Sequence, residues 1–402
     1  MEFRFTEEEE TLRKEVSEFL SKEIPPRWYE LVCADAGLMG LMVPNDETQS
    51  IICEFNRKLA RKGWFAPFFP KKYGGIDATP TEELVIIEEL QRYRAPSIEM
   101  GSSMTSSIVG RNILALGTEK QKNKYCREIG VGEALCCLLY SEPEAGSDLG
   151  SLQTTAIESG DEFIVNGSKI FTTGGQHADY GFMIARTDTA VPKHKGLSMF
   201  IVDMKSPGIT ITPMVNVNNI PDFCQEFFDD VKVPKDNLLG EKNRGWYQLM
   251  GALSHERAMI GGPSMLKAIL YNLIKCTKEM NYDGKSLFED AVTQDELAKL
   301  AIQVEVCRVL AYRVSWMFSL KQVPIKEVSH LFLFCSRLYR TMSNVATEIL
   351  GLYGQLNKGS KWAPMNGAAP FAYFASIGMG IGAGSQEIEM DIIGTHGLGL
   401  PR

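Results

Sequence analysis

The chain has 402 residues, which is longer than one simple core accommodates and predicts two or three domains. Hydrophobic residues make up 44% and charged residues 23%, proportions that are typical of a globular protein. The net charge of -8, from 42 basic and 50 acidic residues, argues against nucleic acid as the main partner.

No uncharged apolar run approaches the roughly 18 residues that a membrane span needs, so we expect none. The first residues, MEFRFTEEEETLRKEV, lack both the apolar core of a secretory signal and the composition of a transit peptide, which predicts a cytoplasmic protein. We expect the nine cysteines, which include no CxxC pair, to stay reduced. With five histidines and no HxxxH spacing, no metal site is expected.

The first third of the chain has the spacing of apolar residues that is typical of helices. Leu12, Val16, Phe19 and Leu20 mark the first of them. The predicted helices lie at about 6–23, 28–43, 48–63, 80–93, 105–116 and 119–129. Residues 1–133 are therefore predicted to form an N-terminal α-helical domain.

The pattern changes near residue 134. The segment DEFIVNGSKIFTTGG alternates polar with β-branched and aromatic residues and contains Asn166-Gly167, which predicts a hairpin with its turn at that pair. Short apolar segments divided by Gly, Pro, Asn and Asp continue as ADYGFMIARTD, GLSMFIVDM, GITITPM and QEFFDDVKVP. Residues 134–235 are predicted to form a middle antiparallel β domain.

Helical spacing returns after Gly245, with predicted helices at about 245–280, 293–321, 325–352 and 384–394. Residues 355–370 look like a long loop, and a loop of that length in a globular domain is more often functional than accidental. The order helices, strands, helices predicts an α+β fold whose C-terminal helical domain spans 236–402.

One candidate binding segment is YSEPEAGSD, residues 140–148. Gly146, Ser147 and Asp148 would form a small polar turn whose N–H groups and hydroxyls suit an anion or the polar edge of a ring. Taken alone, the segment is explained more simply as a surface loop between a helix and a strand.

A second candidate is IFTTGG, residues 170–175. Thr172 and Thr173 beside two glycines suit the close approach of a flat ligand, with Phe171 as a stacking face. Taken alone, this segment is explained more simply as a hairpin strand with ordinary cross-strand threonine pairs.

Taken together, four segments resemble the acyl-CoA dehydrogenase family, in order and through nearly the whole chain. They are YSEPEAGSD, NGSKIFTTGG, FFDDVKVPKDNLLG and GSQEIEMDIIGTHGLGLPR. The resemblance implies an N-terminal helical domain, a middle β domain and a C-terminal four-helix bundle, with FAD between the β domain and the C-terminal helices. It also implies oxidation of an acyl-CoA thioester to the 2-enoyl-CoA, with electrons passed to an electron-transfer flavoprotein.

The family pattern implies roles for individual residues. Ser141 and Thr173 would hydrogen-bond the polar edge of the flavin, Phe171 would pack on the isoalloxazine ring, and Ser147 would lie near the acyl-CoA or the ribityl chain. The further residues that the resemblance assigns to the cofactor are Gly146, Thr172, Ser385 and Glu387.

The catalytic base is the next residue that the resemblance implies. Many relatives carry it near the C-terminus, where this chain has Ala383, whose backbone N–H would bind the thioester oxygen. Relatives of the isovaleryl-CoA type carry it on the first helix of the C-terminal domain, where GALSHERAMIGG places Glu256 beside an apolar stripe, followed by Arg257 as a substrate-binding residue. Without the resemblance, Glu256 is an ordinary helix carboxylate that pairs with a cation or faces solvent, and His255 is packed or solvated.

Two departures from the family pattern concern the FAD pyrophosphate. Met280 and Asp283 stand where relatives have the Arg and Phe of R-x-x-F-G, and Glu348 and Leu352 replace a Gln and a Gly. An acid is unfavourable beside a diphosphate. The hypothesis is that a related subunit supplies the missing Arg and Gln, as in the α2β2 heterotetramers of the steroid side-chain branch.

Three segments also resemble that branch, whose substrates include bulky or ring-bearing acyl-CoAs: FNRKLARKGWFAPFFPKKYGG, residues 136–140 and the loop 355–370. Two alternatives remain open. The leading interpretation is that this chain is the catalytic subunit of such a heteromer, and the alternatives are a non-catalytic partner subunit or an acyl-CoA oxidase on the same fold.

Overall fold

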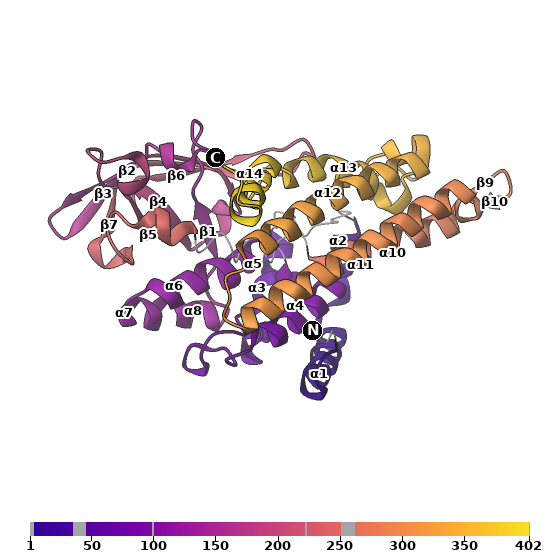
Figure 1. Cartoon of the computed structure of the whole chain (residues 1–402), viewed down its shortest axis with the longest axis horizontal. Coiled ribbons are helices and arrows are strands. Elements are labelled where there is room, and N and C mark those ends of the chain that lie inside the picture. The colour runs from indigo at the N-terminus through magenta and orange to yellow at the C-terminus, as the bar shows by residue number, and fades with distance from the viewer. Residues whose placement is uncertain (1–3, 35–45, 99, 222, 251–261, 402) are drawn as a thin grey trace. The chain divides into compact units, whose positions relative to one another are not determined.

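The computed structural model describes residues 4–34, 46–98, 100–221, 223–250 and 262–401 (Figure 1). The chain divides into two units, which are described separately. Unit 1 consists of Met1–Leu41, Thr79–Ile98 and Arg257–Arg402, and unit 2 of Met42–Ala78 and Glu99–Glu256.

Unit 2 begins with helices and continues into a sheet, as the sequence predicts. Its helices are α3 (Asp46–Arg61), α5 (Met100–Ser103), α6 (Arg111–Leu116), α7 (Glu119–Gln121) and α8 (Arg127–Gly130), with π-helical segments at Met104–Gly110 and Lys122–Cys126. The predicted helix at 119–129 is therefore divided by a π-helical segment, and the helix predicted at 105–116 begins in one.

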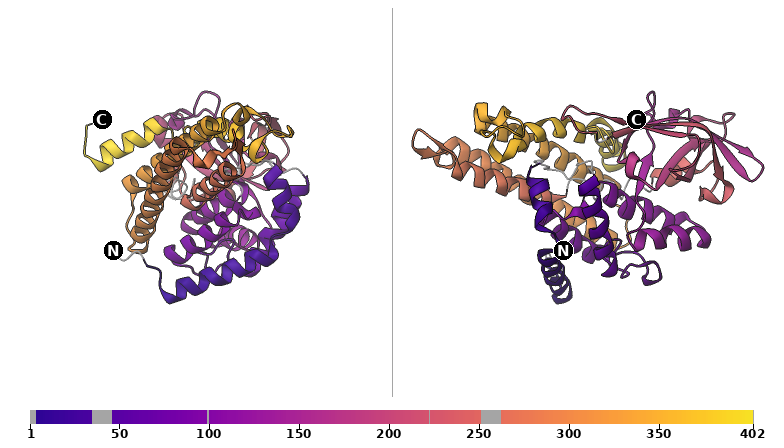
Figure 2. Two further views of the ribbon diagram at one scale, coloured as in Figure 1. Left: turned by 90° about the vertical axis from the view of Figure 1, so that its right-hand side faces the viewer. Right: turned by 180° about the vertical axis from the view of Figure 1, so that it is seen from behind.

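The sheet of unit 2 has the strand order β6-β7-β3-β2-β4-β5-β8, and β1 joins it beside β4 (Figures 1 and 2). The strands are β1 (Cys136–Leu139), β2 (Thr155–Ser159), β3 (Glu162–Thr173), β4 (Tyr180–Arg186), β5 (Leu197–Asp203), β6 (Ile209–Met214), β7 (Phe223–Pro234) and β8 (Leu238–Leu239). Most ladders are antiparallel, as predicted. However, β1 pairs with β4 in parallel and β2 meets β4 in parallel at Thr155 and Arg186, so the sheet is mixed.

The predicted hairpin turn at Asn166-Gly167 is wrong. β2 and β3 form an antiparallel pair that closes between Ser159 and Glu162, and Asn166-Gly167 lies inside β3. There the pairing with β7 shifts register, and Asn166 exchanges two hydrogen bonds of 2.9 Å with Asp230. Asn166-Gly167 therefore forms part of a β-bulge, in which the same residue types are common as in a tight turn.

Unit 1 is built from helices that are far apart in the sequence. They are α1 (Glu7–Glu23), α2 (Pro26–Ala34), α4 (Pro80–Arg92), α10 (Pro263–Glu279), α11 (Ala291–Ser319), α12 (Ile325–Leu350), α13 (Ala368–Met379) and α14 (Gln386–Ile392). Helices α10, α11, α12 and α13 share one apolar core, and α4 packs against α1, α10 and α11 (Figure 1). This confirms the predicted C-terminal helical region.

Two elements predicted for the C-terminal region differ from the structure. The helix predicted at 245–280 is helical at 245–250, and a helix starts at Pro263 after Gly262; the residues between lie outside the described ranges. The predicted loop at 355–370 ends at Gly367, because α13 begins at Ala368. The sequence AAPFAYFASIGM is apolar on every side and contains a proline, so it lacks the amphipathic period that predicts a helix.

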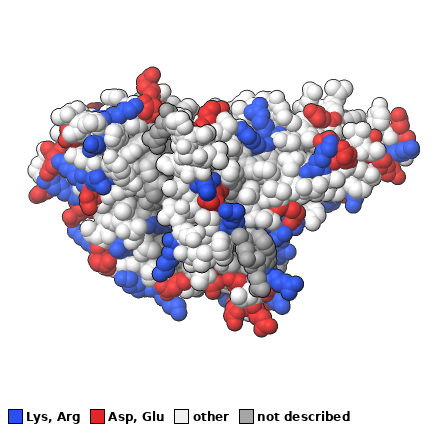
Figure 3. Space-filling view, viewed as in Figure 1, with Lys and Arg blue, Asp and Glu red and all other residues white. Residues whose placement is uncertain are grey.

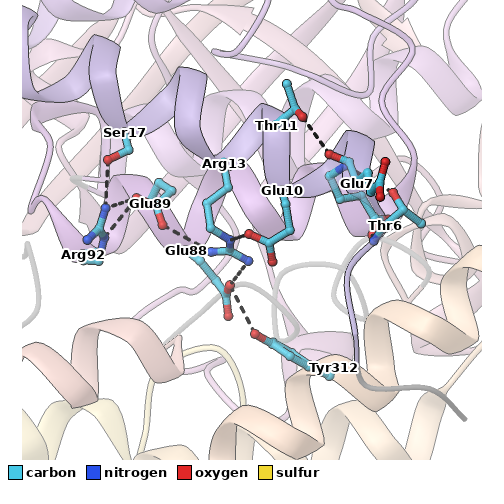
Figure 4. A network of polar contacts seen from close by, with 11 residues as sticks. Thr6, Glu7, Glu10, Thr11, Arg13, Ser17, Glu88, Glu89, Arg92 and Tyr312 are labelled. Carbon is cyan, nitrogen blue, oxygen red and sulfur yellow. Dashed lines mark hydrogen bonds and ion pairs between the residues drawn. The ribbon is translucent and has the colours of Figure 1, made fainter.

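A polar network joins α1 to α4 in unit 1 (Figure 4). Arg13 donates to Glu88 at 3.0 Å and to Glu89 at 3.2 Å, and both carboxylates are buried. Arg92 also donates to Glu89 at 2.9 Å, and the Tyr312 hydroxyl of α11 donates to Glu88 at 3.4 Å. Buried carboxylates require such partners, so this network holds the first helix of the chain on helices of unit 1.

Replacing Arg13 by Met is expected to lower the free energy of unfolding by about 2 kcal/mol, because it removes a cation from two buried carboxylates while Arg92 still serves one of them. The control is Arg27→Met, which breaks an exposed pair with Glu30 and should change that energy by less than about 0.5 kcal/mol. Urea unfolding at neutral pH compares the two. Equal stabilities would show that the network contributes nothing.

The prediction of reduced cysteines is wrong for one pair. Cys307 of α11 and Cys335 of α12 form a disulfide, with their Cα atoms 6.3 Å apart. Adjacent helices bring these residues together, which a search for closely spaced cysteines does not reveal. The free cysteines whose side chains the structure describes are Cys53, Cys126, Cys136, Cys137, Cys224 and Cys276.

Among the described helices, none is long and apolar enough to cross a membrane. Within the same ranges, no group of three or more His, Cys, Asp or Glu side chains is placed to hold a metal ion. On the face shown in Figure 3, basic and acidic side chains are interspersed.

Candidate functional site

The two candidate binding segments of unit 2 meet in the structure. Ser141 follows β1, and its carbonyl accepts a hydrogen bond of 3.0 Å from the N–H of Ile170 in β3. The next residues form a tight turn in which Glu142 and Ala145 exchange two backbone hydrogen bonds of 3.0 Å. Ser141 therefore lies beside the strand that carries Phe171 and Thr173.

A buried ion pair fixes this arrangement. The Lys169 ammonium donates to a Glu142 carboxylate oxygen at 2.9 Å and to the Tyr140 carbonyl at 3.0 Å, and its side chain is 0% exposed. The N–H groups of Gln153 and Thr154 donate to the same carboxylate at 2.5 and 2.9 Å. Burial, only partly offset by Glu142, lowers the pKa of Lys169 to about 8.

Sequence reasoning missed both members of this pair. Glu142 lies inside the YSEPEAGSD segment and Lys169 inside NGSKIFTTGG, so one charged residue from each motif meets the other. The sequence did contain one indication of the pair: two residues of opposite charge lie near the starts of the two segments, which already pointed to a common site.

Phe171 stands at a bulge in β3. The register with β7 shifts between Ile170 and Thr172, and Phe171 takes a φ of 60°, which is rare for a bulky residue. Its side chain is 60% exposed and meets the Phe223 ring edge-on at 6.2 Å. A strained residue that presents an aromatic ring to the surface is a common feature of binding sites.

The two threonines beside Phe171 point to different environments. Thr172 is buried and its hydroxyl donates to the buried carboxylate of Glu226 at 2.6 Å, whereas Thr173 is half-buried. Gly174 follows in a left-handed conformation with φ of 65° and starts a short turn. Thr173 is therefore the threonine whose side chain is accessible, and a contact from Thr172 would have to use its backbone.

The remaining part of the first segment is exposed. Gly146 and Ser147 lie on the surface, and a Cβ added to Gly146 would meet no atom within 4 Å. Asp148 bonds Lys193 at 2.6 and 2.7 Å, and this contact holds the pKa of Asp148 below its usual range. The loop thus exposes Gly146 and Ser147 to solvent, whereas the Asp148 carboxylate is paired with Lys193.

The C-terminal candidates belong to unit 1. Ala383 has a φ of 59° and precedes Gly384. Ser385 is the N-cap of α14 and accepts a hydrogen bond of 3.4 Å from Ile388. Glu387 is exposed in the first turn of that helix, whose N–H groups and Ser385 hold its pKa below the usual range. Their predicted roles stay predictions.

Glu256, Arg257 and His255 lie outside the described residues, so the proposed base and its neighbours stay predictions. The positions that depart from the family pattern are described. Met280 is half-buried against the core of unit 1, and Asp283-Gly284 form the left-handed turn between the short strands β9 (Asn281–Tyr282) and β10 (Lys285–Ser286).

The second departing segment lies at the C-terminal end of α12. Glu348 is exposed near the end of that helix, and Leu352 is 82% exposed just beyond it. Neither of the departing segments offers a cation at the residues where relatives have Arg and Gln.

Comparisons with known proteins agree with this structure. The chain matches the acyl-CoA dehydrogenase N-terminal domain over residues 6–133, the middle domain over 137–231 and the C-terminal domain over 243–398. It is 30% identical to Acyl-CoA dehydrogenase FadE29 of Mycobacterium tuberculosis, over 86% of this chain and 88% of that protein.

Two solved structures are similar over the full length of both chains. The ChsE4-ChsE5 complex from Mycobacterium tuberculosis has a TM-score of 0.87 at 28% identity, and the Tcur3481-Tcur3483 steroid ACAD has a TM-score of 0.86 at 28% identity. The chain therefore belongs to the acyl-CoA dehydrogenase family, whose members are FAD-dependent oxidoreductases that act on CH–CH groups.

Proposed function

We propose that this chain is the catalytic subunit of a heteromeric acyl-CoA dehydrogenase that acts on a bulky, steroid-like or branched acyl-CoA. The observation that supports this most is the exposed Phe171 at the β3 bulge, beside half-buried Ser141 and Thr173. An aromatic face and neutral hydroxyls suit the isoalloxazine ring of FAD. The residues of this chain thus fit the flavin half of the cofactor.

In this proposal, bound FAD supplies the hydride acceptor for the β-hydrogen of the substrate. Glu256 removes the α-proton, so that the α and β carbon–hydrogen bonds break and the α,β double bond forms. The Ala383 N–H group binds the thioester oxygen, on which negative charge develops, and Arg257 and Ser147 contact the substrate. An electron-transfer flavoprotein then accepts the electrons.

The pyrophosphate end of the cofactor supports the heteromer. Asp283 and Glu348 are acids where relatives have Phe and Gln, and Met280 packs against the core instead of offering a cation. A diphosphate binds poorly beside acids without a cation. A homologous subunit that carries the Arg and Gln would complete the site.

The surface of α11 supports the same conclusion. Ile302, Val306, Val309 and Trp316 recur at helical spacing and are all exposed. Arg313 interrupts this row between Val309 and Trp316, but a row of apolar side chains on an exposed helix is typical of a face that is covered by another subunit. The similar ChsE4-ChsE5 and Tcur3481-Tcur3483 structures are complexes of two different chains by their names.

Co-expression with a homologous subunit that carries the missing Arg and Gln tests the proposal. The complex is expected to bind one FAD per pair of subunits, and its flavin absorbance should bleach when a bulky acyl-CoA is added without oxygen. The chain purified alone should hold far less FAD. Tight binding of one FAD per protomer by the chain alone would refute the heteromer, and consumption of oxygen without an electron-transfer flavoprotein would favour an oxidase.

A further inference from the structure

Glu226 is a carboxylic acid inside the core of unit 2. Successive side chains of a strand alternate between faces, so Cys224, Glu226 and Phe228 of β7 point the same way, and all three are buried. Glu226 is 0% exposed. An acid in such a position costs free energy unless a specific interaction requires it.

Charge pairing does not explain this burial. Lys169 lies directly opposite Glu226 in the β3–β7 ladder, but its ammonium turns to Glu142 and to the Tyr140 carbonyl. Glu226 instead accepts the Thr172 hydroxyl at 2.6 Å on one oxygen. Its other oxygen has no hydrogen-bond partner within the described part of the chain.

That second oxygen lies against the turn in which the candidate flavin segment ends. A Cβ added to Gly175 would come within 2.3 Å of it, so a larger residue there would displace the Glu226 carboxylate. From the same strand, the Cys224 thiol donates to the side-chain oxygen of Gln176 at 2.8 Å. The buried side chains of Glu226 and Cys224 on β7 thus hold the segment from Thr172 to Gln176 in place.

We propose that Glu226 is a positioning residue for the flavin site. By holding Thr172 and the turn at Gly175, it fixes the conformation in which Phe171 is exposed and Thr173 is accessible. The inference rests on the proposed function, because it takes these two residues as the flavin contacts.

The protonation state of Glu226 gives this role a distinctive signature. Burial raises its pKa to about 7, although the Thr172 hydrogen bond opposes the shift. The titratable groups that face it are the thiols of Cys137 on β1 and Cys224 on β7, whose pKa values burial also raises, and the ammonium of Lys169. The thiols therefore stay neutral where Glu226 titrates.

The direction of the pH effect follows from linkage. The folded-state pKa of Glu226 lies above its ordinary value of 4.5, so the folded chain binds more protons than the unfolded chain between these two values. The contribution of Glu226 to stability is therefore complete below about pH 4.5 and is lost as the pH rises through about 7. Above that pH, a buried carboxylate without a cation loosens the support of Phe171 and Thr173.

The test uses the full chain in complex with its partner subunit, loaded with FAD. Glu226→Gln keeps the shape and the acceptor oxygen but cannot ionise, whereas Glu226→Met and Thr172→Val remove the hydrogen bond. His177→Gln is the control, because it removes an imidazole from the same turn and leaves Glu226 and Thr172 in place. The readouts are the dissociation constant of FAD, the visible spectrum of the bound flavin and the urea midpoint, each from about pH 5 to 8.

We expect FAD affinity and the flavin spectrum of the parent complex to change with a midpoint near pH 7, and the same change in His177→Gln. Glu226→Gln should bind FAD as the parent does below that midpoint and show no transition in any readout. Glu226→Met and Thr172→Val should weaken FAD binding by about tenfold or more, the effect of losing one buried hydrogen bond.

A pH transition that persists in Glu226→Gln, or unchanged FAD affinity in both Glu226→Met and Thr172→Val, would overturn the inference and leave the proposed function standing. A complex that binds no FAD in any form would overturn both. Because flavin content is measured before the variants are compared, the two failures are distinguishable.

Discussion

Replacing Glu256 by Gln is expected to slow acyl-CoA dehydrogenation by about 10²- to 10⁴-fold, which is the usual contribution of a positioned base. The amide has the size of the carboxylate but cannot accept the α-proton. FAD content and binding of the acyl-CoA should change little, because neither depends on proton transfer. The measurement is the rate of flavin bleaching by acyl-CoA in the complex, mixed without oxygen.

The control for this variant is His255→Gln, which alters the neighbouring side chain without removing a base and should leave the bleaching rate unchanged. Full activity of the Glu256→Gln complex would show that this chain is not the catalytic subunit. In that case the non-catalytic partner becomes the better interpretation, with the base supplied by the other chain.

Replacing Lys169 by Met is expected to lower the free energy of unfolding by about 3–5 kcal/mol, because it leaves the Glu142 carboxylate buried without its cation. The same change should release the turn that holds Ser141 beside β3, so FAD content should fall as well. Urea unfolding and the flavin content of the purified complex measure the two effects.

A matched control exists in the same sheet. Lys232→Met breaks the exposed pair with Glu162 and should cost less than about 1 kcal/mol. Adding Glu142→Leu to Lys169→Met should restore only part of the stability, because the N–H groups of Gln153 and Thr154 would then lose their acceptor. If Lys169→Met lowers the free energy of unfolding by no more than Lys232→Met does, the proposed role of the buried pair is contradicted.

The sequence was sufficient for elements whose pattern has one clear period. Helices α1, α4, α11 and α12 and the strands of the sheet lie close to their predicted ranges. The predictions fail where a residue pattern is compatible with two structures or has no clear period. Asn166-Gly167 fits a turn and a bulge equally well, and α13 has no polar face from which a period could be recognised.

The candidate site shows a similar division. The motifs located Ser141, Phe171 and Thr173, and the structure brings their segments together. They did not reveal that the buried side chains of Lys169 and Glu226 support the site from the core of the sheet. A charged residue in an alternating strand pattern is normally assigned to the solvent-exposed face. Only the bulge at Phe171, which reverses the direction of the following side chains, places Thr172 over Glu226.

The division of unit 1 into separate stretches of chain affects how the protein is made. Helix α4 ends at Arg92 and its partner α10 begins at Pro263, so 170 residues separate them. At about 5–20 residues per second, the ribosome needs roughly 10–30 s to supply that partner. During this time the buried faces of α1 and α4 have no core to join, and a fragment that ends after the N-terminal helices is expected to aggregate or bind chaperones instead of folding.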